Sequence, residues 1–335
     1  MLADNYFLGV DVGSVSTNLV LLGSDNRVEE ALYLRTQGRP MQTIQEGVKL
    51  LRSKIGSKAQ ILGVGTTGSA RQLAATLLGA DVMKNEITAH AVAASRLYPQ
   101  VRTILEIGGQ DSKIIILRDG VVVDFAMNTV CAAGTGSFLD QQAARLGLPI
   151  EEFAALATQA LHPVRIAGRC SVFAESDMIH KQQLGHSLAD IVAGLCEAMV
   201  RNYLNNVGKN KKIVGPVLFQ GGVAANPGIH KAFEIELGQE IIIPDYFAVM
   251  GALGAAYLAQ EKVGLNSKKP THFRGLEMVE TSFQARSFDC SGCANHCEIV
   301  RISQNEEILA HWGDRCGKWS SNLTRENDST AIEQG

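Results

Sequence analysis

The chain has 335 residues, which is long enough for two domains and a small further module. Hydrophobic residues make up 46% and charged residues 19% of it, as in an ordinary globular protein, and no apolar run is long enough to cross a bilayer. The formal net charge of −3 excludes the strongly basic surface that nucleic acids require, so we expect no nucleic-acid and no membrane partner. The seven cysteines accompany no secretory signal, which predicts a cytoplasmic location where cysteines are metal ligands, redox groups or core residues.

Residues 7–22 predict the first functional feature, a hairpin of two buried strands joined by a turn rich in glycine and serine. Such a turn lets backbone amides approach phosphate oxygens closely. Asp11, at the end of the first strand, can hold a magnesium ion through water. The same kind of turn also occurs in hairpins that bind no ligand.

An internal repeat strengthens this interpretation, because residues 104–117 can be aligned with the first hairpin. Glu106 falls beneath Asp11 at an offset of 106 − 11 = 95 residues, and Gly108 falls beneath Gly13. At the same offset, Gly109 falls beneath Ser14 and Ser112 beneath Thr17. A duplicated hairpin predicts two similar domains that hold one phosphate chain from both sides, although chance similarity is the alternative.

The remaining segments up to residue 262 alternate between strands and helices. A strand from residue 216 breaks at Gly221 and Gly222 before a helix, and this turn could hold an adenine and ribose or be a simple connection. Further strands are expected at residues 60–69, where the strand ends in a turn, and at residues 240–244. Helices are expected at residues 41–55, 70–78, 87–97, 187–207 and 248–261.

Two cysteines each precede a predicted helix: Cys131 before residues 136–146 and Cys170 before residues 172–183. The unpaired N–H groups at a helix start favour a thiolate or an anionic cluster. Two cysteines cannot fill a four-ligand site, so a cluster here would need two more from a second copy of the chain. The alternative is that both are buried core residues, as free cysteines often are.

The region after residue 264 begins with a polar segment, residues 266–270, which we expect to be a linker. A Cys-x2-Cys-x3-Cys run and a fourth cysteine across a predicted hairpin around residues 304–306 indicate a metal site. Zinc is the default and a second iron–sulfur cluster is the alternative, with His296 as a further candidate ligand. The final residues, 320–335, are predicted to be disordered. The four cysteines of this site are Cys290, Cys293, Cys297 and Cys316.

Taken together, the motifs resemble those of the ATP-dependent activators of 2-hydroxyacyl-CoA dehydratases, a family shared with the ATPase subunits of benzoyl-CoA reductase. The resemblance covers residues 5–262 and depends on residues 9–17, 106–111, 128–137, 167–177 and 219–223. The cysteine-centred motifs are specific to this family, whereas the phosphate hairpins belong to the wider actin, hexokinase and heat-shock-chaperone superfamily.

The resemblance implies an α/β fold of two ribonuclease-H-like domains with a nucleotide in the cleft between them. The first domain would be residues 1–100 completed by the helix at 247–262, and the second, with the cluster cysteines, residues 101–246. Residues 263–319 would form the cysteine-rich module, followed by the tail.

The resemblance also implies a mechanism. A homodimer would hold one 4Fe–4S cluster on its twofold axis, with Cys131 and Cys170 of each protomer as ligands. Ferredoxin or flavodoxin would supply an electron, and ATP binding and hydrolysis would expose the cluster to a partner iron–sulfur protein. Because the C-terminal cysteine module departs from the short activators, the partner could be a dehydratase or a double-cubane cluster protein.

Within this resemblance each candidate residue receives a role. Asp11, Glu106 and Asp111 would hold or orient Mg²⁺ and water, and Gln110 would contact phosphate beside them. The expected contacts to ATP or ADP are Gly13, Ser14, Ser16, Thr17, Gly108, Gly109, Gln220, Gly221, Gly222 and Asn226. Gly134 and Gly136, beside Cys131, could report the nucleotide state to the cluster.

Two other functions remain open from the sequence. A small-molecule kinase of the same superfamily would need a carboxylate base beside the γ-phosphate, which Asp111 could provide. The chain has no obvious polar insert that would bind a sugar. A metal-binding scaffold, whose only site is the C-terminal module, is the second.

Overall fold

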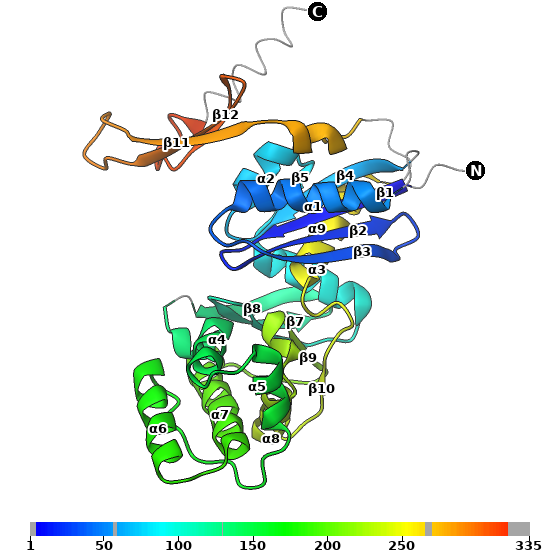
Figure 1. The fold of residues 1–335 in the computed structure, drawn as a ribbon. Helices are drawn as coiled ribbons and strands as arrows, with labels where there is room; N and C mark the ends of the chain where they lie inside the picture. The colour runs from blue at the N-terminus through cyan, green and yellow to red at the C-terminus, as the bar shows by residue number, and fades with distance from the viewer. Residues whose placement is uncertain (1–4, 56–58, 129, 265–269, 321–335) are drawn as a thin grey trace, which may run out of the picture.

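The computed structural model describes residues 5–55, 59–128, 130–264 and 270–320. The described residues form two five-stranded sheets, each covered by helices, and a separate three-stranded sheet near the C-terminus (Figure 1). None of the helices in these ranges combines the length and apolar composition needed to cross a membrane. The predicted tail, apart from Ser320, and the predicted linker, apart from Pro270, lie outside the described residues.

The first sheet has the strand order β3-β2-β1-β4-β5. Its first three strands form an antiparallel meander, and the last two add in parallel beside β1. The strands are β1 (Asn5–Val12), β2 (Ser16–Gly23), β3 (Val28–Arg35), β4 (Gln60–Thr67) and β5 (Val82–Met83).

The second sheet repeats this arrangement, with the order β8-β7-β6-β9-β10. Three antiparallel strands are again followed by two parallel ones. The strands are β6 (Thr103–Ile107), β7 (Ser112–Arg118), β8 (Val121–Asn128), β9 (Val217–Gln220) and β10 (Ile241–Ile242).

The strand registers confirm the predicted repeat residue by residue. Asp11 pairs with Asn18 in the first hairpin and Glu106 with Lys113 in the second, so both partners keep the offset of 95 (106 − 11 and 113 − 18). The turns also match, because the N–H of Gly13 donates to Ser16 O at 2.9 Å and that of Gly108 donates to Asp111 O at 3.0 Å. The similarity of the two hairpins is therefore a structural duplication and not chance.

Four helices cover the first sheet: α1 (Pro40–Lys54), α2 (Arg71–Leu78), α3 (Glu86–Leu97) and α9 (Met250–Val263). Helix α9, predicted as the closing helix, returns from the second half of the chain and packs directly on the strands. A Cβ at Gly9 would lie 1.9 Å from Ala252 O, and one at Gly65 would lie 2.0 Å from Ala255 O. Only glycine permits this approach, which brings the start of α9 beside the end of β1.

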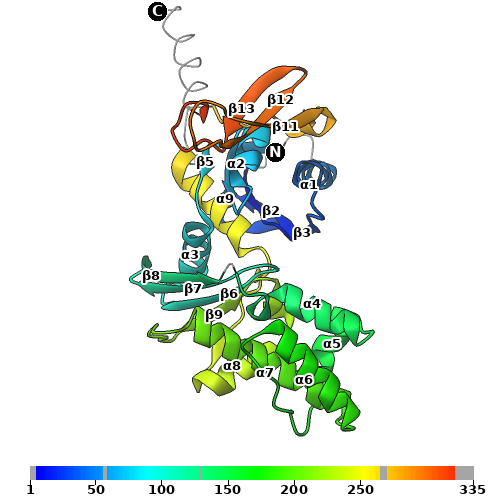
Figure 2. The same cartoon turned by 90° about the vertical axis from the view of Figure 1, so that its left-hand side faces the viewer.

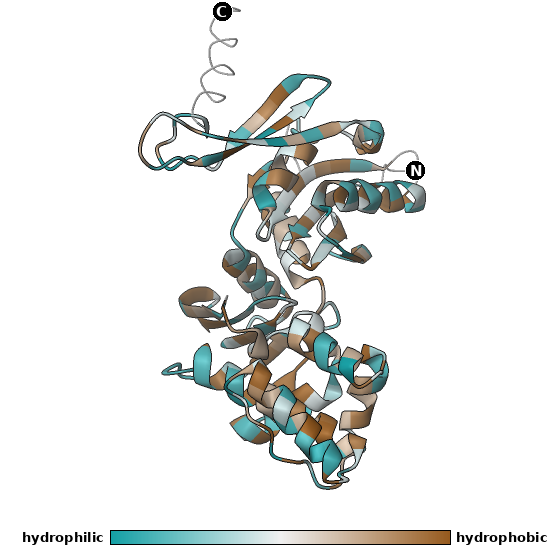
Figure 3. Cartoon of the chain, turned by 60° about the vertical axis from the view of Figure 1, so that its left-hand side comes forward, coloured by the Kyte–Doolittle hydropathy of each residue, from teal (hydrophilic) through white to brown (hydrophobic). Residues whose placement is uncertain are grey.

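The second sheet carries a larger helical layer, shown below it in Figure 2. Its elements are η1 (Ala132–Gly134), α4 (Gly136–Arg145), α5 (Ile150–Ala157), α6 (Ser171–Gln183), α7 (Leu188–Asn206), η2 (Gly222–Ala225) and α8 (Pro227–Leu237). Tyr203, Phe219 and Phe233 form an edge-to-face aromatic group with centroid separations of 5.3 and 5.1 Å. Helix α5, only eight residues long, has no counterpart among the predicted helices. In Figure 3 the helices carry both teal and brown bands, as expected where one side packs and the other is exposed.

The two halves share a hydrophobic core where they meet. Phe7 and Val20 of the first sheet, residues of α3 and α9, and Ile104 and Ile115 of the second sheet belong to one buried cluster. Burial of this kind fixes the distance between the two duplicated hairpin turns.

The C-terminal module contains η3 (Leu276–Glu280), β11 (Phe283–Asp289), β12 (Glu298–Gln304) and β13 (Glu307–Trp312). The predicted hairpin around residues 304–306 is present, and β11 extends it to three strands. Met278 and Ile302 join the core formed by α1, α2 and the first sheet, and Gln45 Nε2 donates to Thr281 O at 2.8 Å. The module is therefore packed on the first half of the chain, away from the second.

Candidate active site

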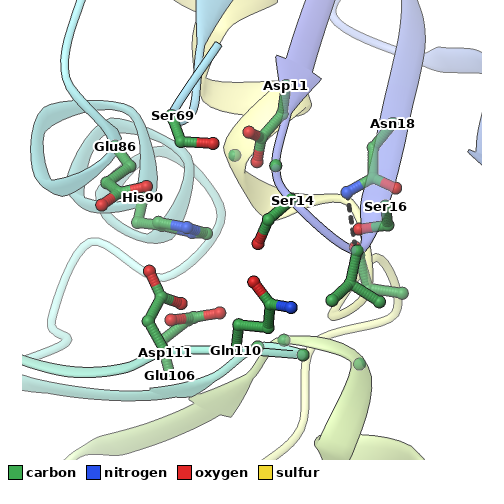
Figure 4. Close-up of a pocket in the computed structure, with 18 of the residues that line it drawn as sticks. Asp11, Ser14, Ser16, Asn18, Ser69, Glu86, His90, Glu106, Gln110 and Asp111 are labelled. Atoms are coloured by element: carbon green, nitrogen blue, oxygen red, sulfur yellow. Dashed lines mark hydrogen bonds between the residues drawn. The ribbon is translucent and has the colours of Figure 1, made fainter. Parts of the chain in front are cut away.

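The two duplicated turns face each other across a polar cavity of about 260 Å³. Asp11, Ser14 and Ser16 contribute from the first hairpin, and Glu106 and Gln110 from the second (Figure 4). The turns also touch, because a Cβ at Gly109 would lie 2.6 Å from the side chain of Val15. The cavity is thus bounded on both sides by backbone amides of glycine-rich turns, which suits phosphate.

A buried lysine, Lys113, neutralises part of the acidic cluster beside this cavity. Its Nζ lies 2.7 Å from Asp111 Oδ1, 3.0 Å from Glu106 Oε2 and 4.0 Å from Glu86 Oε1. Burial disfavours the lysine cation, but the three carboxylates outweigh this and raise its pKa above the ordinary value. Lys113 therefore stays charged, as a fixed cation at the wall of the cavity.

Two of the predicted catalytic acids are strongly perturbed. Burial, with Glu86 and Asp111 nearby, raises the pKa of Asp11 to about 7, and burial likewise raises that of Glu106 to about 7. Asp11 is closely enclosed, since a Cβ at Gly68 would lie 2.4 Å from its Oδ1 and one at Gly251 would lie 2.1 Å from its Oδ2. Carboxylate oxygens in such a cluster are the ligands that Mg²⁺ prefers, and a bound cation would favour their ionised forms.

His90, from α3, is a neutral member of the cavity wall. Burial lowers its pKa to about 3, with the charge of Lys113 contributing. Its Nδ1 accepts a hydrogen bond from Gln220 Nε2 at 2.7 Å, which fixes the orientation of the ring. Gln220 thereby lies behind the cavity rather than on its surface.

A larger and more apolar cavity of about 530 Å³ adjoins the polar one. Tyr33 and Arg35 of β3 face it from the first half, and Leu139, Ile150 and Ala154 of α4 and α5 from the second. Arg35 and Asp140 form an ion pair across it, with Nη1 3.6 Å from Oδ2. These wall residues come from segments far apart in the sequence, and only the alternating exposure of β3 hints at Tyr33 and Arg35.

The cysteine loops lie next to this cleft in the second half. The half-exposed Cys131 precedes η1, and the half-exposed Cys170 precedes α6. The alternative that both are core residues is wrong; the buried cysteine is Cys196 of α7. Val130 and Phe173, beside the two thiols, are 95% and 65% exposed, so the loops present an apolar surface to the surroundings.

Two buried asparagines hold these loops, and neither was predicted to have a role. The amide of Asn128 donates to Cys131 O at 2.8 Å and its Oδ1 accepts from the Cys131 N–H at 2.9 Å. Asn202 Nδ2 donates to Gly168 O at 2.5 Å and lies 3.7 Å from Cys131 Sγ. The backbone around the first cysteine is therefore tied on two sides.

Hydrogen bonds also join the second phosphate turn to the start of α4. The N–H of Gly136 donates to Gly108 O at 2.8 Å, and the N–H of Ser137 donates to Gly109 O at 2.8 Å. Ser137 Oγ adds a bond to Gly109 O at 2.6 Å. Because η1 and α4 follow Cys131 directly, a shift of this turn must also move the cysteine loop.

Comparison with known proteins agrees with this geometry. The sequence matches the BadF/BadG/BcrA/BcrD ATPase family over residues 8–259, about three quarters of the chain. The chain belongs to this family. The match ends before the C-terminal module, which is therefore an addition to the family's part of this BadF/BadG/BcrA/BcrD ATPase family member.

Individual relatives of the family member include enzyme activators. The (R)-2-hydroxyglutaryl-CoA dehydratase activating ATPase of Acidaminococcus fermentans is 36% identical over 265 residues, covering 77% of this chain and 98% of its own. The activator of lactoyl-CoA dehydratase of Anaerotignum propionicum is 35% identical over 260 residues, covering 76% and 98%. The crystal structure of the activator of the 2-hydroxyisocaproyl-CoA dehydratase from Clostridium difficile with bound ADPNP superposes with a TM-score of 0.70 at 31% identity, covering 77% and 95%. A benzoyl-CoA reductase component of Thauera aromatica is also similar, and the predicted resemblance and fold class are confirmed.

Most of the predicted site residues of this family member line the two joined cavities. Thr17, Gly134 and Gln220 do not line them, because Thr17 is fully buried against Thr36, Gly134 lies against Asn202, and Gln220 bonds His90. Asn226 contributes backbone, since its Oδ1 caps α8 by accepting from the N–H of Gly228 at 2.9 Å. The lining residues are Asp11, Gly13, Ser14, Ser16, Glu106, Gly108, Gly109, Gln110, Asp111, Gly136, Gly221, Gly222 and Asn226.

The four C-terminal cysteines are far from the cleft of the family member. Cys290 and Cys297 face each other where β11 and β12 meet, with the N–H of Cys290 donating to Cys297 O at 2.8 Å, and Cys316 follows β13. Trp319 Nε1 donates to Cys290 Sγ at 3.4 Å. Within the described residues no three His, Cys, Asp or Glu side chains are arranged to hold a metal ion. The metal site predicted for these cysteines is not assembled and stays a prediction.

The raised pKa values of Asp11 and Glu106 predict how the stability of the nucleotide-free family member depends on pH. Each acid holds its proton in the folded state up to about pH 7 but loses it near its ordinary value of 3.8 or 4.5 when unfolded. The folded state therefore binds more protons between about pH 4 and 7, and this part of the stability is lost as the pH rises through 7. We expect the free energy of unfolding, measured with urea without Mg²⁺, to fall over this range by a few kcal/mol more in wild type than in Asp11→Asn. Equal slopes in the two proteins would contradict the assignment.

Proposed function

We propose that this chain couples ATP hydrolysis to electron transfer, from a 4Fe–4S cluster that a homodimer holds with Cys131 and Cys170 of each protomer. The observation that carries the proposal is the direct hydrogen bonding of the second phosphate turn to the start of α4, the helix that follows Cys131. Residues 1–100 with 247–262, and residues 101–246, would act as the two moving domains. Residues 263–319 would be the added module.

The two joined cavities support nucleotide binding in the cleft. Triphosphate oxygens suit the polar cavity, where Gly13, Ser14 and Ser16 face Gly108 and Gly109. Adenosine suits the apolar cavity beside Gly222 and the backbone of Asn226. The solved relative with bound ADPNP, at 31% identity, gives independent support for ATP or ADP as the ligand.

The acidic cluster supports Mg²⁺-dependent hydrolysis. Asp11 and Glu106 have the donor chemistry to hold the cation directly or through water, and Asp111 can orient water beside them. The bound Mg²⁺ would supply charge neutralisation for the phosphates. Gln110 points into the cavity from the second turn and can contact the γ-phosphate (Figure 4). Lys113, held by Glu106 and Asp111, keeps these acids from repelling one another.

The two cysteine loops fit half of a cluster site. Each thiol is partly exposed at a helix start, and two cysteines in one chain leave two ligand positions for a second copy. Such a cluster would supply one-electron chemistry. The residues of this chain hold the thiols in place, exclude water with Val130 and Phe173, and provide an apolar rim for contact between protomers.

Coupling requires that the nucleotide bind the two domain arrangements with different affinity. A nucleotide that contacts both turns favours the arrangement in which they are closest. Because Gly108 and Gly109 are bonded to Gly136 and Ser137, that preference would be transmitted to the Cys131 loop.

The names of the relatives guide the choice of partner. They are activators of 2-hydroxyacyl-CoA dehydratases and a component of benzoyl-CoA reductase. We propose an iron–sulfur dehydratase or a double-cubane cluster protein as the electron acceptor, ferredoxin or flavodoxin as the donor, and a cytoplasmic location. The C-terminal cysteines would hold zinc or a second iron–sulfur cluster.

The proposal is tested on protein purified without oxygen. We expect about four iron atoms per dimer in the cleft-associated cluster, ATP hydrolysis, and faster removal of iron by a chelator with Mg²⁺-ATP than with Mg²⁺-ADP. A monomeric protein that retains the cluster, or chelation rates independent of nucleotide, would overturn it. ATP turnover that a sugar stimulates, with a phosphorylated product, would favour the kinase instead.

A further inference from the structure

Asn202 is a buried residue of α7 that contacts both cysteine loops. It is 3% exposed, and its Nδ2 donates to Gly168 O, two residues before Cys170, at 2.5 Å. The same nitrogen lies 3.7 Å from the sulfur of Cys131. One side chain from a third element therefore spans the two segments that carry the cysteines.

The surroundings fix which end of the amide faces the sulfur. The carbonyl of Gly168 can only accept, so the nitrogen of Asn202 must face it. Oδ1 points the other way and accepts from Asn206 Nδ2 at 2.9 Å. An amide nitrogen carries two hydrogens, and with one directed to Gly168 the second is available to Cys131.

The packing around Asn202 leaves it little freedom. A Cβ at Gly134, in the turn that follows Cys131, would lie 2.8 Å from Asn202 Oδ1. Its neighbour Tyr203 is fully buried and donates from its hydroxyl to Lys113 O at 2.6 Å, which anchors this part of α7 to the second hairpin. The amide is thus held in position by the core rather than by the loops that it contacts.

We propose that Asn202 is a positioning residue for the cluster: it sets the spacing of the two cysteine loops and donates a hydrogen bond to the Cys131 sulfur. The inference rests on the proposed function, since it concerns the cluster assigned to these cysteines. Donors to ligand sulfurs stabilise the added negative charge of the reduced state and so raise the reduction potential. Loss of the donor should therefore make the cluster harder to reduce.

The test compares Asn202→Leu and Asn202→Asp with the matched control Asn206→Ala, purified without oxygen. Both Asn202 variants lack the amide donor at nearly unchanged volume, whereas the control removes only the donor to Oδ1. We expect a midpoint potential shifted to more negative values and several-fold faster removal of iron by a chelator in the Asn202 variants. We expect wild-type values for both quantities in the control.

The outcomes separate this inference from the proposed function. Wild-type protein that holds no cluster would overturn the proposed function itself. A cluster in wild type whose potential is the same in an Asn202 variant that still binds ATP would overturn only the role of Asn202. If Asn202→Leu does not fold, the potential of Asn202→Asp decides.

Discussion

Cys131→Ala is expected to lose all of the cluster iron while keeping its fold and its affinity for ATP. The thiol is half-exposed in a loop held by the backbone bonds of Asn128, so its removal leaves those bonds intact. A bridging site that loses one ligand from each protomer retains only two of four, which cannot hold a 4Fe–4S cluster. Iron and sulfide analysis with the visible spectrum measures the loss, and gel filtration measures the dimer.

Two variants control this result. Cys196→Ala changes a cysteine of the same half that is buried in the core and has no route to a shared cluster, so its iron content should equal that of wild type. Cys316→Ala changes an exposed cysteine of the C-terminal module and should affect only metal bound there. Unchanged iron in Cys131→Ala would mean that the cluster lies elsewhere, with the C-terminal cysteines as the first candidates.

Asp11→Asn is expected to reduce the rate of ATP hydrolysis by about 100- to 1000-fold. The substitution keeps the shape of a side chain enclosed by Gly68 and Gly251 but removes the charge that a magnesium ion requires. At neutral pH it also removes a buried acid whose pKa is raised to about 7, so the nucleotide-free protein should become more stable, not less. Loss of activity together with a higher Tm distinguishes a catalytic role from a structural one.

The control for this experiment is Asp25→Asn, which alters an exposed acid in the turn that follows β2. It should change neither the hydrolysis rate nor the Tm. Hydrolysis by Asp11→Asn within a few-fold of wild type would remove Asp11 from the proposed site and leave Glu106 and Asp111 as the cation ligands.

The duplicated hairpins could be predicted from the sequence because their pattern is local. Alternating apolar residues, an acid at the strand end and glycine in the turn are all encoded within about fifteen residues, and the strand registers keep the same offset of 95 residues. The cysteine motifs before α4 and α6 were equally local. Helix α9 could be placed because its small residues predict close packing.

The residues that complete the site could not be predicted in this way. Lys113 reads as an ordinary charge in a strand, and only folding buries it among three carboxylates from different segments. Asn202 is separated from Cys131 by 71 residues and acts through a contact that sequence alone does not contain. The ion pair between Arg35 and Asp140 likewise joins the two halves. Each depends on tertiary geometry rather than on local pattern.

The attachment of the C-terminal module has a practical consequence. It packs on α1 and the core of the first half through Gln45, Met278 and Ile302, whereas both cysteine loops belong to the second half. Fluorescent dyes on the module and on α6 would thus sit on opposite arms of a lever whose pivot is the nucleotide cleft. Their energy-transfer efficiency would follow opening and closing in real time, without any label near the chemistry.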